Sequence, residues 1–172
     1  MNIVLTGFMG TGKTVIGKLL AKKLSWEYID TDELIEKREN MKISEIFAIK
    51  GEPYFRKIES EIIKEVSKKD KCVISTGGGV VLKEENMNEL EKNGTIINLS
   101  ASPDKIFERT SLDKSRPLLN KENPKEEIIK LLKFRAPYYD RCHFRINTDE
   151  PDPEKNVEKI LSFLREKCNL KI

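Results

Sequence analysis

The sequence predicts an α/β protein of the doubly wound class: a three-layer arrangement in which helices cover both faces of a mostly parallel sheet. Two observations predict it. Short β-prone runs alternate along the chain with longer segments of helical periodicity, and the glycines and acidic residues of unusual spacing directly follow those runs. A chain of 172 residues that is 38% hydrophobic is long enough for one such core. We therefore expect a single domain over residues 1–172, with ligands at the carboxyl ends of the strands.

The strands are expected where Val, Ile, Thr and aromatic residues gather in short runs. The run C-V-I-S is apolar in character throughout, which is typical of a strand buried on both faces. The second run ends in D-T-D and the third in T-G-G-G, so the loops after the strands differ from ordinary turns. The five expected strands cover residues 2–6, 26–29, 72–75, 95–99 and 143–147.

The helices are expected where apolar residues recur at a helical period and where capping residues mark the ends. Ser102-Pro103 supplies an N-cap and a first-turn proline, and Asn123-Pro124 and Asp152-Pro153 repeat this chemistry. A turn at residues 51–53 separates two helical segments. The expected helices cover residues 13–24, 32–40, 43–49, 53 to about 68, about 83–92, 103–111, 124 to about 135, and 153 to about 168.

Composition excludes several function classes. The sum of 32 Lys and Arg against 29 Asp and Glu leaves a net charge of +3 with both signs interspersed, which argues against a nucleic-acid or membrane partner. No apolar run reaches the roughly 18 residues that a membrane span needs, and residues 3–8 lack the basic leader of a signal peptide. Three cysteines without metal-ligand spacing and one histidine indicate a reducing cytoplasm and no protein-ligated zinc.

Residues 7–14, G-F-M-G-T-G-K-T, match the phosphate-binding pattern G-x-x-x-x-G-K-[ST]. Glycines let successive backbone N–H groups converge on phosphate oxygens, Lys13 reaches the outer phosphates, and the Thr14 hydroxyl can ligate Mg²⁺. A strand is expected before this loop and a helix after it, so the positive end of the helix dipole lies where phosphates would bind. The pattern therefore predicts a nucleotide-binding loop, and a turn of the same composition without phosphate is the alternative.

Asp30 and Asp32 stand two residues apart at the end of the second expected strand. If the backbone stays extended, both carboxylates leave the same face, about 7 Å apart by strand rise. One could help to hold a hydrated metal ion while the other orients or deprotonates an acceptor hydroxyl. The alternative is that D-T-D caps the following helix, since Thr31 and Asp32 are good N-cap residues.

Arginine is rare in this chain, with 8 arginines against 24 lysines, so each arginine suggests a need for a planar, bidentate donor. Arg56 has Glu59 three residues later on the same helical face, where the carboxylate can hold the guanidinium. An exposed intrahelical ion pair is the alternative for that pair. Arg116 lies in a polar, aperiodic segment and is placed like an arginine on a lid, or else like an ordinary solvated loop residue.

Three glycines at residues 77–79 follow the third expected strand. They allow a ligand to approach the backbone closely, or they make a tight strand-to-helix turn. In both interpretations, bulky side chains are excluded from the edge of the sheet that carries the phosphate loop.

Taken together, these stretches resemble the shikimate kinases, small P-loop kinases related in fold to the nucleoside monophosphate kinases. The resemblance covers essentially the whole chain. It implies one P-loop kinase domain with sheet order 2-3-1-4-5, a substrate-binding region at about residues 32–60 and a mobile lid at about 111–123. The matching stretches are G-F-M-G-T-G-K-T at 7–14, D-T-D at 30–32, F-R-x-x-E at 55–59, G-G-G at 77–79, R-P-L-L at 116–119 and R-A-P-Y-Y at 135–139.

The resemblance further implies ATP-dependent phosphorylation of the 3-hydroxyl of shikimate, in the pathway to chorismate and the aromatic amino acids. It implies Mg²⁺ as the cofactor and a cytoplasmic monomer whose partners are its two substrates. Thr14 would ligate the metal with Asp30 in its outer shell, and the catalytic residues would be Lys13, Asp32 and Arg116. The residues implied for shikimate are Asp32, Arg56, Gly78 and Arg135. Those implied for ATP are Gly10, Thr11, Gly12, Lys13, Thr14, Val15, Arg109, Arg116 and Pro153.

Two other functions stay open on the residues alone. One is a kinase of another small hydroxylated metabolite, such as gluconate or a nucleoside monophosphate. The other is a nucleotide-binding module that has lost catalysis. A carboxylate-bearing acceptor is favoured by Arg56, Arg135 and the triple glycine, and this argues against a kinase of another metabolite. The presence of Lys13 and Asp32 argues against a module that has lost catalysis.

Overall fold

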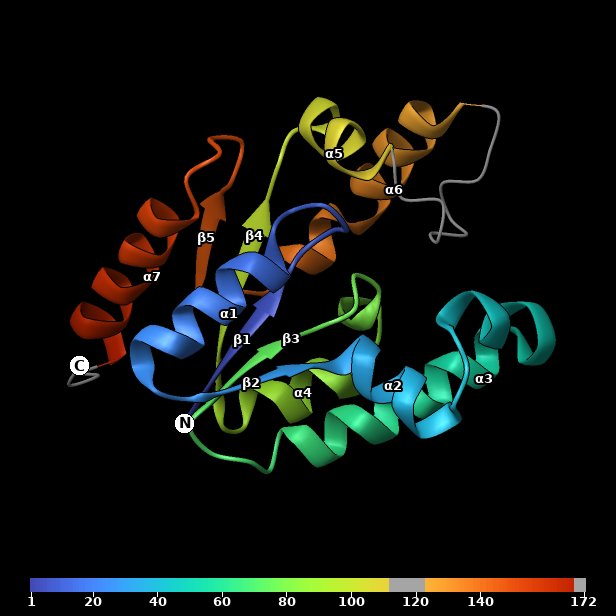
Figure 1. Cartoon of the computed structure of the whole chain (residues 1–172), viewed down its shortest axis with the longest axis horizontal. Helices are drawn as coiled ribbons and strands as arrows, with labels where there is room; N and C mark the ends of the chain where they lie inside the picture. The colour runs from blue at the N-terminus through green and yellow to red at the C-terminus, as the bar shows by residue number, and fades with distance from the viewer. Residues whose placement is uncertain (112–122, 169–172) are drawn as a thin grey trace.

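The structure is a computed structural model that describes residues 1–111 and 123–168 (Figure 1). Within these residues, five parallel strands form one sheet in the order β2-β3-β1-β4-β5. The predicted fold class and strand order are therefore confirmed. The strands are β1 (Asn2–Thr6), β2 (Glu27–Asp30), β3 (Cys72–Ser75), β4 (Gly94–Ser100) and β5 (Phe144–Asn147).

Helices alternate with these strands and pack on both faces of the sheet (Figure 1). Helices α1 and α7 pack together on one face, and α3 and α4 lie on the other. The described helices are α1 (Lys13–Leu24), α2 (Thr31–Glu39), α3 (Ile43–Val66), the 3-10 turn η1 (Val80–Leu82), α4 (Glu84–Glu91), α5 (Pro103–Thr110), α6 (Pro124–Tyr139) and α7 (Pro153–Cys168).

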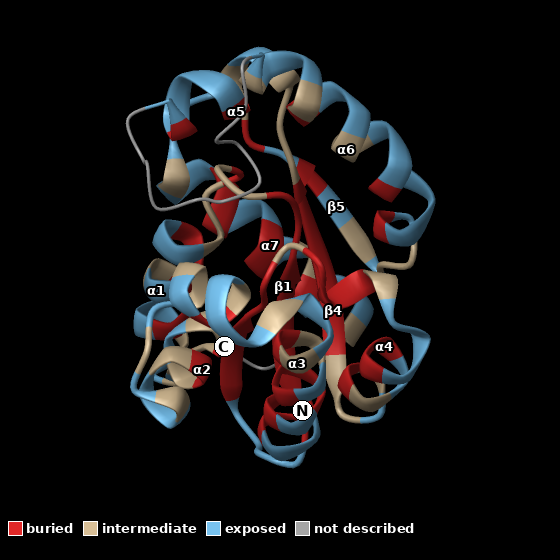
Figure 2. Cartoon of the chain, turned by 90° about the vertical axis from the view of Figure 1, so that its right-hand side faces the viewer, coloured by how far each residue is buried: buried red, intermediate tan, exposed pale blue. Residues whose placement is uncertain are grey.

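Each face of the sheet has its own apolar core, because successive side chains of a strand point to opposite faces. In β1, Ile3 and Leu5 pack with α1 and α7, whereas Val4 packs with α3 and α4. Figure 2 shows the central strands as buried, with the outer sides of the helices exposed. Burial on both faces explains why these strands read as continuous apolar runs.

Helix α3 agrees with the sequence-based expectation at its break, whereas α6 differs from it. Helix α3 runs as one element from Ile43 to Val66, but Gly51 has φ 79° and ψ 165°, so the chain breaks there as the predicted turn at residues 51–53 required. Helix α6 continues past its expected end near residue 135, through Pro137 to Tyr139. Because Tyr139 is only 6% exposed, burial of its ring offsets the hydrogen bond that a proline inside a helix removes.

Almost all of the predicted lid, including Arg116, lies outside the described residues, which leave out 112–122. No helix within the described ranges is long and apolar enough to cross a membrane. The three cysteines are free thiols, and Cys72 is a buried residue of β3.

Candidate active site

In the part of the chain that the structure describes, a cavity of about 730 Å³ opens beside the carboxyl ends of β1, β2 and β3. It is lined by the phosphate loop, by the residues after β2, by residues of α3 as far as Glu59 and by the triple glycine after β3. The structure thus brings the phosphate loop and the predicted acceptor residues together. Of the residues predicted from the sequence, the cavity lining includes Gly10, Gly12, Lys13, Thr14, Val15, Asp30, Asp32, Arg56, Gly78 and Arg135.

The phosphate loop turns into α1 at Gly12, the N-cap residue, whose φ of 89° is a left-handed conformation that favours glycine. The backbone N–H groups of the first helical turn have no partners within the helix, so they can bind an anion. The Lys13 ammonium donates to the carbonyl oxygens of Gly7, at 2.8 Å, and Phe8, at 2.9 Å. The buried Thr11 hydroxyl also donates to Phe8 O, so side chains of the loop itself hold its shape.

The backbone is extended at Asp30, the last residue of β2, but not beyond it, because α2 begins at Thr31. Asp30 is the N-cap residue: its Oδ1 accepts from the backbone N–H groups of Asp32, at 3.0 Å, and Glu33, at 3.4 Å. Capping was the alternative interpretation, although it was assigned to Thr31 or Asp32. The Tyr28 hydroxyl donates to the other oxygen, Asp30 Oδ2, at 3.1 Å. Both carboxylates still line the cavity, and the donors around Asp30 fix its orientation.

The three glycines after β3 make room for side chains of the site itself. A Cβ at Gly77 would lie 2.8 Å from Asp32 Oδ1, and one at Gly79 would lie 2.5 Å from Arg56 Nη1. A Cβ at Gly78 would lie 3.5 Å from Arg135 Nη1. The close approach that the glycines were expected to permit is therefore made by Asp32, Arg135 and Arg56, one beside each glycine.

Arg56 and Glu59 form a half-buried ion pair on α3. Arg56 Nη1 donates to Glu59 Oε2 at 2.9 Å, and its Nε and Nη2 donate to Glu52. Burial raises the pKa of Glu59, and the positive charges of Arg56 and Arg135 offset only part of that rise. Burial lowers the pKa of Arg56, but Glu59 and Glu52 outweigh it and the net pKa is raised. The alternative of an exposed intrahelical pair is wrong, since the Glu59 side chain is only 1% exposed.

Arg135 comes from α6 and is 4% exposed. Its guanidinium carbon lies 5.5 Å from the centre of the Phe8 ring, a cation–π distance. Among the described residues no carboxylate forms a salt bridge with Arg135, and its Nε has no hydrogen-bond partner. A buried guanidinium in these surroundings is well suited to an anionic ligand.

The residues predicted for the adenine side are not part of the cavity lining. The Arg109 guanidinium donates to Thr148 O at 2.6 Å and to Gly10 O at 3.1 Å, so it ties the phosphate loop to the segment after β5. The Thr148 hydroxyl lies 2.9 Å from Thr11 O, to which it can donate. Pro153 begins α7, as expected from its place after Asp152.

Sequence reasoning did not single out Tyr28, Thr148 or Tyr139, although each makes a hydrogen bond to a predicted site residue or its backbone. The Tyr139 hydroxyl donates to Gly78 O at 2.7 Å. A partial signal existed for two of them: Tyr139 ends the stretch R-A-P-Y-Y, and Thr148 directly follows an expected strand. Nothing in the sequence indicates which distant backbone atom the Tyr139 and Thr148 hydroxyls meet.

Comparisons with known proteins point to one family. The family model described as shikimate kinase matches residues 9–165. A shikimate kinase of Thermodesulfovibrio yellowstonii is 54% identical over 160 residues, covering 93% of this chain and 92% of that protein. One from Caldicellulosiruptor saccharolyticus is 52% identical, covering 94% of each.

Among solved structures, the shikimate kinase from Acinetobacter baumannii in complex with shikimate superimposes with a TM-score of 0.93 at 36% identity. The match covers 99% of this chain and 95% of that one. The sequence matches extend from the phosphate loop to α7, and the structural match covers nearly every residue. This chain therefore belongs to the shikimate kinase family.

Proposed function

We propose that this chain transfers the terminal phosphoryl group of ATP to the 3-hydroxyl of shikimate, giving shikimate 3-phosphate and ADP. Its family membership supports this function over a gluconate-type kinase or a silent nucleotide-binding module. The observation that carries the choice of acceptor is the buried Arg135, which has no salt bridge with the described residues and faces the same cavity as the phosphate loop. A small acid whose carboxylate meets Arg135 and Arg56 satisfies that buried charge.

The acceptor residues would divide the work between the two ends of shikimate. Arg56, held by Glu59, and Arg135 would bind the carboxylate beside the glycines. Asp32 would hold the hydroxyls and align the one that attacks, since it lines the same cavity as the phosphate loop and lies beside Gly77. A loose phosphoryl-transfer transition state needs positioning and charge more than it needs deprotonation, so alignment is the main role of Asp32.

The donor residues would bind the phosphates. The N–H groups at the start of α1 and the Lys13 ammonium would bind phosphate oxygens, with Lys13 exchanging its present contacts to the Gly7 and Phe8 carbonyls for the outer phosphates. Arg116, outside the described residues, would add a guanidinium to the phosphates, and Arg109 and Pro153 would lie along the adenine.

The ATP dependence of the family implies a divalent metal, and we assign it as Mg²⁺. The candidate donors fit that ion. Thr14 and Asp30 offer a hydroxyl and an oriented carboxylate, the hard oxygen ligands that Mg²⁺ prefers together with phosphates and water. Thr14 would ligate it directly and Asp30 through water. When bound, the metal ion would neutralise charge on the transferring phosphates.

The decisive experiment is a coupled assay of ADP release with shikimate, gluconate and nucleoside monophosphates as acceptors. We expect release that depends on shikimate and is absent with the others. ATP binding without shikimate-dependent release would instead support a silent module. Asp32→Asn keeps the shape of the side chain and removes its charge, so it should lower kcat by about a hundredfold or more. Near-normal turnover of that variant would remove Asp32 from the alignment of the acceptor.

A further inference from the structure

Tyr139 is a buried residue whose hydroxyl is not used in the function proposed above. It is the last residue of α6 and is 6% exposed, and its hydroxyl donates to the carbonyl oxygen of Gly78 at 2.7 Å. Burial raises the pKa of Tyr139, with Arg135 offsetting part of the rise. The hydroxyl therefore keeps its proton and remains a donor at neutral pH.

The bond from Tyr139 constrains a peptide group that borders the acceptor side of the cavity. The carbonyl of Gly78 and the N–H of Gly79 belong to one planar trans peptide and point in opposite directions. Holding Gly78 O against Tyr139 therefore fixes the Gly79 N–H on the other side of the plane. Glycines rotate more freely than any other residue, so a loop of three needs such an external bond to keep one orientation.

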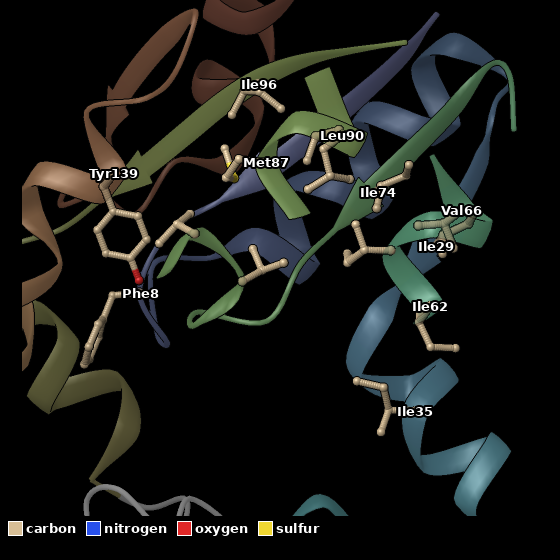
Figure 3. Close-up of a cluster of buried hydrophobic side chains, with 14 of the residues drawn as sticks. Phe8, Ile29, Ile35, Ile62, Val66, Ile74, Met87, Leu90, Ile96 and Tyr139 are labelled. Atoms are coloured by element: carbon tan, nitrogen blue, oxygen red, sulfur yellow. The ribbon is translucent and has the colours of Figure 1, made fainter. Parts of the chain in front are cut away.

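Gly78 is also packed on two further sides. A Cβ at Gly78 would lie 3.4 Å from Gly7 O of the phosphate loop and 3.5 Å from Arg135 Nη1. Arg135 and Tyr139 stand one helical turn apart on α6, so the same helix contacts Gly78 with both side chains. Phe8 and Tyr139 belong to one apolar cluster and lie at the same end of it in Figure 3.

We propose that Tyr139 is a positioning residue for the acceptor: its hydroxyl orients the peptide between Gly78 and Gly79, and so sets the backbone against which the acceptor's carboxylate lies beside Arg135 and Arg56. This inference rests on the proposed function. Helix α6 then acts on the acceptor in two ways: Arg135 supplies a positive charge directly, and Tyr139 positions the backbone beside it. Among the described residues, the hydrogen bond of the Tyr139 hydroxyl is to Gly78 and not to the phosphate loop, so the effect is expected on the acceptor.

The test is Tyr139→Phe, which removes the hydroxyl and keeps the ring. Losing one hydrogen bond of ordinary strength should raise both the KM for shikimate and its Kd, measured by calorimetry without nucleotide, by about fivefold. The KM for ATP and kcat should stay within about twofold of wild type by the same reasoning, because phosphate binding and alignment of the hydroxyl do not use this bond. Tyr138→Phe is the matched control, since Tyr138 is the adjacent residue of α6 and is 40% exposed.

A purely structural role for Tyr139 would give a different pattern. The thermal unfolding midpoint would fall and all kinetic parameters would worsen together, or the KM and Kd for shikimate would match wild type; either result overturns the inference. If the variant's midpoint approached the assay temperature, the same ratios would be measured at a lower temperature. Wild-type protein without shikimate-dependent ADP release would overturn the proposed function itself, whereas active wild type with an unchanged Tyr139→Phe would overturn only this inference.

Discussion

Arg56 Nη1 donates to Glu59 Oε2 at 2.9 Å, so the guanidinium of Arg56 holds the carboxylate of a buried glutamate. The pKa of Glu59 is nevertheless raised above its ordinary value of 4.5, because burial outweighs the positive charges of Arg56 and Arg135. The folded state therefore binds a proton at a pH where the unfolded state has lost it. The free energy of unfolding falls as the pH rises from about 4.5 through the higher pKa of the folded state.

Glu59→Gln removes this proton uptake. We expect the stability of wild type relative to the variant to be greatest below about pH 4.5 and to decline as the pH rises toward neutrality. Urea unfolding at a series of pH values measures the difference. Glu61→Gln, on an exposed position of the same helix, controls for the loss of one carboxylate. A difference between wild type and Glu59→Gln that does not change with pH would contradict the prediction.

Gly79→Ala should move Arg56 without unfolding the chain. Gly79 has φ −95° and ψ −6°, which alanine adopts readily, but its Cβ would lie 2.5 Å and 2.6 Å from the two terminal nitrogens of Arg56. The guanidinium is the flexible partner, so it will shift away from the place where it would bind the carboxylate of shikimate. We expect the KM for shikimate to rise about tenfold and the KM for ATP to stay nearly constant. Equal changes in both constants, or a large fall in melting temperature, would contradict this reading.

Thr148→Val should weaken the donor side selectively. The Thr148 hydroxyl lies 2.9 Å from Thr11 O and accepts from Arg109 Nη1 at 3.4 Å, so valine leaves a buried carbonyl of the phosphate loop without this donor. An unsatisfied buried acceptor costs about 1–3 kcal/mol, and we expect a higher KM for ATP with little change for shikimate. Thr148→Ser retains the hydroxyl and should restore the KM for ATP. If serine and valine behaved alike, the hydroxyl would have no part in holding the loop.

His143→Ala should lower stability without affecting kinetics. The His143 backbone N–H donates to Ile96 O at 2.9 Å, and its Nδ1 accepts from the Ile96 N–H at 3.0 Å, which extends the pairing of β4 and β5 by one side-chain bond. Alanine would leave the N–H of a fully buried residue without its acceptor, at a cost of about 1–3 kcal/mol. His143→Asn places an oxygen near the position of Nδ1 and should recover most of that loss in urea unfolding. Equal stability of the Ala and Asn variants would exclude this bond as the cause.

The sequence predicted the elements because local patterns determine most of them here. The strand C-V-I-S, the caps at Ser102 and Asp152, and the break at residues 51–53 all lie where expected. The strand order could not be obtained from these patterns. It came from family resemblance, since nothing local tells β1 to pair with both β3 and β4.

The errors in the sequence-based prediction come from contacts that the sequence patterns do not show. The backbone was considered as extended from Asp30 through Asp32, but the Asp30 carboxylate caps α2, so the extended backbone ends with β2 at Asp30. Helix α6 was expected to end before Pro137, but burial of Tyr139 extends it. The triple glycine was expected to let a ligand approach the backbone closely or to make a tight turn. The structure shows that Asp32, Arg56 and Arg135 occupy the space beside the three glycines.

The place of β1 in the middle of the sheet has a consequence for biosynthesis. Ile3 pairs in register with Val73 and with Thr95, which follow it by 70 and 92 positions. A ribosome therefore delivers the most deeply buried strand long before either neighbour exists. Ile3, Val4 and Leu5 stay without a strand partner until β3 is made, 70 positions later. Non-local pairing of this kind slows folding and exposes apolar surface. Slowed translation before residue 72 should consequently increase aggregation of this protein, whereas slowing after residue 100 should have little effect.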